Sequence, residues 1–107
     1  MSRAVEPLLQ LNEKHLALIR ELLNRHLPGV EVWAYGSRIK GTAKPWSDLD
    51  LVVFADPLQQ NAVGELREAF EESDLPFRVD LFVWDELPAS FKENINENHL
   101  ILQAQSD

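Results

Sequence analysis

The sequence contains no cysteine, which excludes disulfide bonds and thiolate metal sites. No apolar run approaches the ~20 residues that a membrane-spanning helix needs, so no membrane association is expected. The first ten residues lack the charged and then apolar pattern of a signal peptide. These absences together predict a soluble cytoplasmic protein.

Basic residues are also scarce, with 10 Lys and Arg against 18 Asp and Glu, for a net charge of -8. This balance argues against direct nucleic-acid binding, which depends on basic groups that neutralise phosphates. Segment 32–47 differs, because it holds Arg38, Lys40 and Lys44 and no acidic residue. Its charge of +3 leaves -11 for the remaining residues. A small basic island in an acidic chain suits one compact anionic ligand.

The length of 107 residues predicts one domain, residues 1–107, with little room for a separate substrate-recognition domain. Hydrophobic periodicity predicts helices and strands in alternation. Helices are expected from Asn12 to Pro28, from Asp56 to Ser73 and through 87–95, and strands at 31–35, 49–54, 77–84 and, at the end, 99–103. This order predicts an α/β (α+β) fold with a small mixed sheet covered by helices.

Asp48 and Asp50 open the second predicted strand, two residues apart, so they are expected on the same face. The rest of this strand is apolar, and two adjacent carboxylates repel one another unless a cation or proton lies between them. Asp80 interrupts the third predicted strand in the same way. If these strands are neighbours, the three carboxylates converge and can hold two Mg²⁺ ions, an arrangement suited to in-line displacement at phosphorus. Asp80 would lie nearest an incoming hydroxyl and could accept its proton.

A second group of residues lies between the first two predicted strands. Gly36 allows the backbone to approach a ligand closely, and the Ser37 hydroxyl can donate to a phosphate oxygen. Arg38 and Lys40 can balance the charge of a triphosphate. Ser47 precedes the acidic pair and can steady that turn.

Each of these features has a structural explanation when it is taken alone. A Gly-Ser pair is usually a turn, and an Asp-x-Asp is often a cap or a solvated edge. Asp80 can form a salt bridge, for which Arg78 is a candidate, and Arg38 and Lys40 can be solvated surface. Their order and spacing favour a catalytic site over a set of unrelated features.

The segment from Gly36 to Leu51, GSRIKGTAKPWSDLDL, resembles the signature of the polymerase-beta-like nucleotidyltransferase superfamily. Within that superfamily the chain is similar to the minimal nucleotidyltransferases, or MNT proteins, over nearly its whole length. The resemblance implies a three- to four-stranded mixed sheet flanked by helices. It also implies ATP as substrate, with the triphosphate bound at Gly36 and Ser37 and Mg²⁺ at Asp48, Asp50 and Asp80. Many members carry a second arginine where this chain has Lys40, which keeps the charge but lacks the bidentate fork.

The resemblance implies a partner as well, because MNT proteins are commonly paired with HEPN-type RNase toxins. The expected function is Mg-dependent transfer of AMP to a tyrosine hydroxyl of that partner by a type VII-like antitoxin. Two alternatives remain open at this point. One is nucleotidyl transfer to a small molecule, although relatives of that kind typically carry an added domain. The other is an antitoxin that neutralises by binding alone, against which the presence of all three acids weighs.

Overall fold

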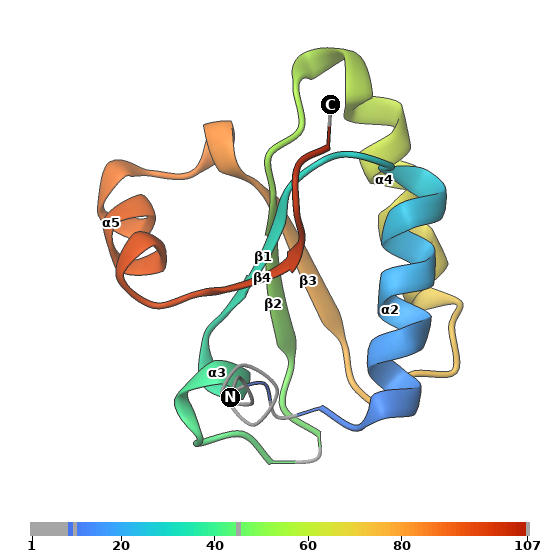
Figure 1. The fold of residues 1–107 in the computed structure, drawn as a ribbon, viewed down its shortest axis with the longest axis vertical. Coiled ribbons are helices and arrows are strands. Elements are labelled where there is room, and N and C mark those ends of the chain that lie inside the picture. Colours follow the sequence, from blue (N-terminus) through green and yellow to red (C-terminus); the bar gives the residue numbers. More distant parts are fainter. Residues whose placement is uncertain (1–8, 10, 45, 107) are drawn as a thin grey trace.

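The computed structural model describes residues 9, 11–44 and 46–106. Helices and strands alternate along the chain as predicted (Figure 1). The elements are α2 (Glu13–His26), β1 (Val32–Tyr35), α3 (Ser37–Lys40), β2 (Leu49–Val53), the 3-10 turn η1 (Pro57–Gln59), α4 (Gln60–Glu71), β3 (Val79–Val83), the 3-10 turn η2 (Trp84–Glu86), α5 (Ala89–Glu97) and β4 (Leu100–Gln103).

Helix α2 begins and ends where the sequence predicts. The side chain of Asn12 accepts a hydrogen bond from the backbone N–H of His15 at 2.8 Å, which satisfies one of the free donors of the first turn. The helix ends at His26, just before Pro28 and Gly29, and it buries Ile19 with its neighbouring leucines. Local capping and one apolar face therefore define this helix.

The second long helix, α4, is preceded by a capping box centred on Asp56. Its carboxylate accepts from the N–H of Leu58 and the Gln59 side chain accepts from the N–H of Asp56, both at 2.9 Å. Pro57 stands at the first position of the 3-10 turn, where a missing N–H costs nothing. The capping signal in the sequence is confirmed, although the first turn it starts is 3-10 rather than α.

The strands form one mixed sheet in the order β3-β2-β1-β4. Strand β1 pairs antiparallel with β2 and with β4, whereas β2 and β3 are parallel. Helix α4 connects β2 to β3, because two consecutive parallel strands need a long crossover connection between them. The predicted small mixed sheet is confirmed with four strands, and the short terminal strand β4 forms one of its two edges.

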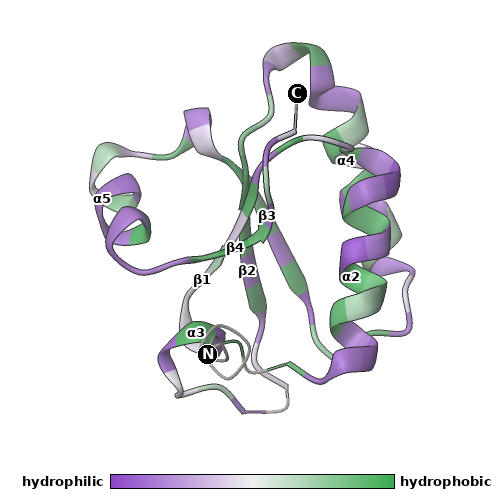
Figure 2. Cartoon of the chain, in the orientation of Figure 1, coloured by the Kyte–Doolittle hydropathy of each residue, from purple (hydrophilic) through white to green (hydrophobic). Residues whose placement is uncertain are grey.

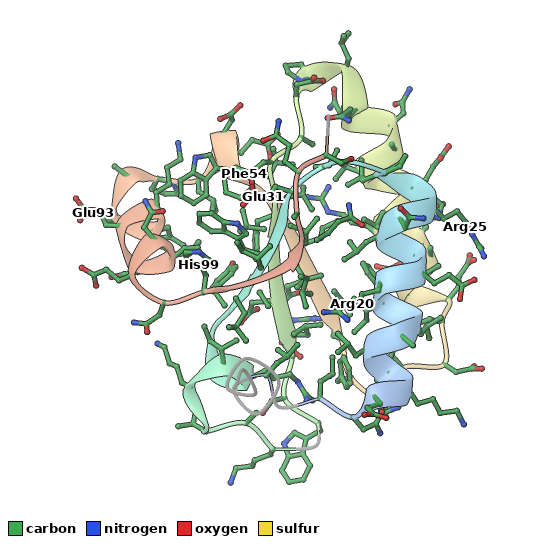
Figure 3. All side chains as sticks on the ribbon, viewed as in Figure 1. Arg20, Arg25, Glu31, Phe54, Glu93 and His99 are labelled. Carbon is green, nitrogen blue, oxygen red and sulfur yellow. The ribbon has the colours of Figure 1, made fainter. Side chains whose placement is uncertain are left out.

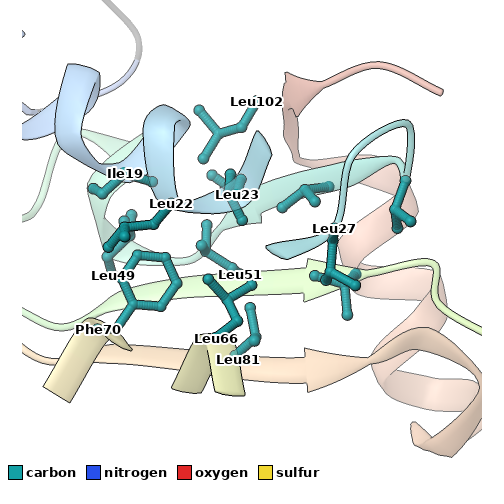
Figure 4. Close-up of a cluster of buried hydrophobic side chains, with 14 of the residues drawn as sticks. Ile19, Leu22, Leu23, Leu27, Leu49, Leu51, Leu66, Phe70, Leu81 and Leu102 are labelled. Carbon is teal, nitrogen blue, oxygen red and sulfur yellow. The ribbon is translucent and has the colours of Figure 1, made fainter. Parts of the chain in front are cut away.

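Side-chain alternation gives the sheet two different faces. One face carries the core, in which Leu49, Leu51 and Val53 of β2 pack with buried residues of α2 and α4 (Figure 4). Helices α2 and α4 lie together on this side, whereas α5 lies on the other (Figure 1). In Figure 2 the strands are mainly hydrophobic and α5 is largely hydrophilic. The second face is thus free to carry polar groups.

An aromatic cluster occupies part of this second face, beneath α5 (Figure 3). The His99 ring stacks on Trp33 with centroids 3.7 Å apart. Phe54 and Trp84 each pack edge-on against Trp33 and are tilted against one another. Sequence alone left it open whether Trp33, Trp46 and Trp84 are exposed or buried. The structure buries Trp33 and Trp84 partly in this cluster and leaves Trp46 68% exposed.

Helix α5 forms where a final helix is predicted, but it contributes little to the core. The spacing of Leu87, Phe91 and Ile95 predicts one apolar face, yet Ile95 is the only residue of α5 that is buried, and Phe91 is 52% exposed. Phe91 thus lines an opening instead of packing tightly against the sheet. No helix in the described residues is both long enough and apolar enough to span a membrane.

Candidate active site

The two acidic strands are neighbours, and Asp50 of β2 is the register partner of Asp80 in β3. Asp48 directly precedes β2, and the N–H of Leu49 donates to the carbonyl of Arg78 at 2.9 Å, which ties the two strand starts together. Since β2 and β3 are parallel and in register, their side chains at positions 50 and 80 lie on the same face. This face is the one opposite the core.

Burial and repulsion both act on this pair of carboxylates. Burial, followed by the charges of Asp80 and Asp48, raises the pKa of Asp50 to about 6, and the nearby Arg78 partly opposes this rise. The same two effects, burial first and then the charges of Asp50 and Asp80, raise the pKa of Tyr35 to about 12. The acids thus act on one another and on the neighbouring strand β1.

Arg78 is the cation that partly compensates this negative charge. Its Nη2 atom lies 3.4 Å from Oδ2 of Asp48, and its Nε atom lies 3.2 Å from Oδ1 of Asp80. Its side chain is 71% exposed, so the two ion pairs are screened by solvent and contribute little stability. The salt bridge considered for Asp80 is present, and Arg78 is shared with Asp48.

The donor set determines which ion the site suits. Carboxylate oxygens are the ligands that Mg²⁺ prefers, and the opposed pair of Asp50 and Asp80 fits one or two carboxylate contacts to such an ion. Within residues 9, 11–44 and 46–106, however, no three His, Cys, Asp or Glu side chains are arranged to hold a metal. Asp48 and Asp80 are instead paired with Arg78. The predicted three-carboxylate arrangement remains a prediction.

Gly36 forms the turn between β1 and α3, as predicted, and its geometry requires glycine. Its φ of 87° and ψ of -156° lie in a region that is essentially restricted to glycine. A Cβ atom at this position would overlap Oδ2 of Asp50. The turn therefore packs closely against the Asp50 carboxylate, and Ser37 follows at the first position of α3.

Arg38 was predicted to balance phosphate charge or to be surface, but the structure gives it a different environment. It is 5% exposed, donates to the carbonyl of Ser47 from Nε at 3.0 Å and from Nη2 at 2.9 Å, and lies 4.2 Å from the centre of the Phe77 ring. Burial lowers the pKa of its guanidinium. The Ser47 hydroxyl also accepts from the N–H of Lys44 at 2.8 Å. Arg38 and Ser47 thus fix the loop that leads into Asp48.

Lys40 is exposed and lines a cavity of about 420 Å³ between the Gly36 turn and α5. This cavity was not predicted from the sequence, in which no pocket for a base is visible. The available signal was the spacing of Phe91, Asn94 and Asn98, which puts an aromatic ring and two amides on one helical face.

Comparison with known proteins identifies a family for this chain. Residues 16–102 match the nucleotidyltransferase domain family. A Haemophilus influenzae protein described as probable protein adenylyltransferase MntA is 43% identical over 96 residues, which cover 89% of this chain and 84% of that protein.

Solved structures of toxin–antitoxin complexes have the same fold. One, a toxin–antitoxin with AMP-PNP, matches with a TM-score of 0.59 and 18% identity, over 89% of this chain and 76% of the matched chain. Another, a tri-AMPylated Shewanella oneidensis HEPN toxin in complex with MNT antitoxin, matches with a TM-score of 0.55 and 17% identity, over 87% and 72%. At this identity the likeness concerns the fold alone. The family match and the curated relative show that the chain belongs to the nucleotidyltransferase domain family.

Proposed function

We propose that the protein transfers AMP from Mg-ATP to a hydroxyl of a partner protein, and that the partner is a HEPN-type toxin which it thereby neutralises. The observation that carries the proposal is the close packing of the Gly36 turn against the carboxylate of Asp50, whose register partner on the neighbouring strand is Asp80. A phosphate-binding turn beside paired carboxylates is the arrangement that transfer at a phosphorus atom requires.

The residues have distinct roles in this reaction. Asp48, Asp50 and Asp80 would hold the two Mg²⁺ ions, which would supply positive charge to the triphosphate and to the attacking and leaving oxygens. Gly36 and Ser37 bind the triphosphate, and the exposed Lys40 adds positive charge to the same turn. Arg38 and Ser47 act indirectly, because they fix the loop that positions Asp48.

The transfer itself is a single displacement. The acceptor oxygen attacks the α-phosphorus of ATP, and the bond from that phosphorus to the bridging oxygen of the β-phosphate breaks. AMP becomes bonded to the acceptor and pyrophosphate leaves. The Asp80 carboxylate accepts the proton of the acceptor hydroxyl. A tyrosine of the toxin is the acceptor that we favour.

The partner is proposed from three observations. The Haemophilus influenzae relative is described as a protein adenylyltransferase, and chains of the same fold occur in toxin–antitoxin structures. The chain itself carries a net charge of -8, which suits a basic partner. Within the described residues Trp46 is among the large apolar side chains exposed to solvent, and it lies in the loop next to the acids.

A growth assay tests the antitoxin role. The HEPN-like neighbouring gene is expressed with the wild-type protein, with Asp48→Asn or with Asp85→Asn. Asp85 is an exposed acid outside the site, so its variant controls for the same change of charge. We expect growth with the wild type and Asp85→Asn and arrest with Asp48→Asn. Growth with Asp48→Asn would favour neutralisation by binding alone, and the absence of a HEPN-like neighbour would overturn the antitoxin role.

A further inference from the structure

We propose that the cavity between the Gly36 turn and helix α5 binds the nucleoside part of the nucleotide donor, with α5 recognising the base. This proposal rests on the proposed function. It assigns a part of the substrate site that includes residues outside the segment from Gly36 to Leu51. The cavity of about 420 Å³ lies within the size range of small-molecule sites.

Two walls from distant parts of the chain form the cavity. Tyr35, Gly36 and Lys40 form one wall. The other comes from α5 and the residue that follows it, and includes Phe91, Asn94, Ile95, Glu97 and Asn98. Positions 91, 94, 95 and 98 recur at helical spacing, so a single face of α5 is turned to the cavity.

The cavity continues directly from the acidic site. Gly36 touches the Asp50 carboxylate on one side and lines the cavity on the other. Tyr35 is the register partner of Asp50 and lines the same cavity. A nucleotide whose phosphates lie at the Gly36 turn therefore has this cavity next to it. Lys40 places positive charge at the turn side, whereas Glu97 disfavours phosphate at the α5 side.

The α5 wall has the chemistry that nucleobases require. The Phe91 ring is half exposed, and an aromatic ring at a site border offers a surface for base stacking. Among residues 9, 11–44 and 46–106, the amide side chains of Asn94 and Asn98 have no hydrogen-bond partner. An amide offers one acceptor and two donors, which match the paired donor and acceptor of an adenine edge.

Helix α5 is otherwise poorly explained as a structural element. It buries Ile95 alone, and its remaining apolar residue of large size, Phe91, faces the opening. A helix kept for packing would bury both residues. An apolar residue left half exposed beside two amides is better explained by a ligand than by the core.

Calorimetric binding in the presence of Mg²⁺ tests the assignment with two probes, ATP and inorganic tripolyphosphate. The variants are Phe91→Ala, Asn94→Ala and the double variant, and the matched control is Asn96→Ala. Asn96 is exposed on the same helix but does not line the cavity. We expect each single variant to weaken ATP binding about tenfold, because stacking and amide pairing each contribute on that scale. Tripolyphosphate binding should be unchanged in all variants.

Two results would overturn the cavity assignment: wild-type ATP affinity in the double variant, or an equal loss of affinity for both probes. Circular dichroism of each variant shows whether the fold is retained. The same measurements distinguish failure of the cavity assignment from failure of the proposed function. If the wild type transfers AMP while the double variant binds ATP normally, the cavity assignment alone falls. If the wild type binds neither probe, both proposals fall.

Discussion

Replacing Gly36 by alanine should destabilise the protein more than the same replacement at Gly41 or Gly64. The backbone at Gly36 has φ 87° and ψ -156°, a region that costs a residue with a Cβ about 1–3 kcal/mol. The new methyl group would also overlap Oδ2 of Asp50. The Asp50 carboxylate must move to make room, and a side-chain torsion displaced from its staggered position costs a further ~1 kcal/mol.

The free energy of unfolding should thus fall by about 2–4 kcal/mol in Gly36→Ala, which lowers the Tm by about 10 °C or more in a domain of this size. Replacements at two other glycines separate the cost of the backbone conformation from the cost of the overlap with Asp50. Gly41 has φ 80° and no atom within 4 Å of a built Cβ, so Gly41→Ala should cost about 1 kcal/mol from the backbone alone. Gly64 lies within α4 and is equally unobstructed, so Gly64→Ala should stabilise by about 0.5–1 kcal/mol.

Urea denaturation of the wild type and the three variants measures these differences. The expected order of stability is Gly64→Ala above the wild type, then Gly41→Ala, then Gly36→Ala. If Gly36→Ala were as stable as Gly41→Ala, the contact between the turn and Asp50 would be refuted. That result would remove the central geometric support for the candidate site.

The remaining predictions concern groups around the site and the helix ends. Arg38→Ala should lower the free energy of unfolding by about 2 kcal/mol, because it leaves the carbonyl of Ser47 without its buried donor, and a loss below about 0.5 kcal/mol would contradict that role. Arg78→Gln should change it by less than about 1 kcal/mol, as expected for exposed ion pairs, and urea titration would detect a larger effect. Asn12→Ala should cost about 1 kcal/mol through loss of the α2 cap, and unchanged stability in thermal unfolding would show that the cap is dispensable.

Much of the fold follows from local chemistry that is visible in the sequence. Asn12 and Asp56 cap helices because their side chains accept from nearby N–H groups, which depends only on adjacent residues. The apolar run around Leu51 predicts a buried strand for the same local reason. Asp80 meets Asp50 because one helix connects two parallel strands, a topology that the order of elements already favours.

The environment of single side chains was less predictable, because it depends on what the fold brings near. Arg38 belongs to the most exposed class of residues, yet it is buried where Phe77 and the carbonyl of Ser47 come together. Phe91 has the spacing of a core residue, but no described element covers it. Arg78 reaches two acids because β3 lies beside β2, and sequence reasoning considered one of them. Hydrophobic periodicity predicts which face of a helix or strand a residue occupies. It does not predict which residues of other elements lie against that face.

The chemistry of transfer is tested most directly by the position of the label in ATP. The protein and its purified HEPN-like neighbour are incubated with Mg²⁺ and ATP labelled either at the α-phosphate or at the γ-phosphate, with the wild type, Asp50→Asn and Asp85→Asn. We predict that α-label, and no γ-label, becomes attached to the neighbour with the wild type and with Asp85→Asn, and that it is absent with Asp50→Asn. Attachment of γ-label, or undiminished α-label with Asp50→Asn, would contradict nucleotidyl transfer at this site.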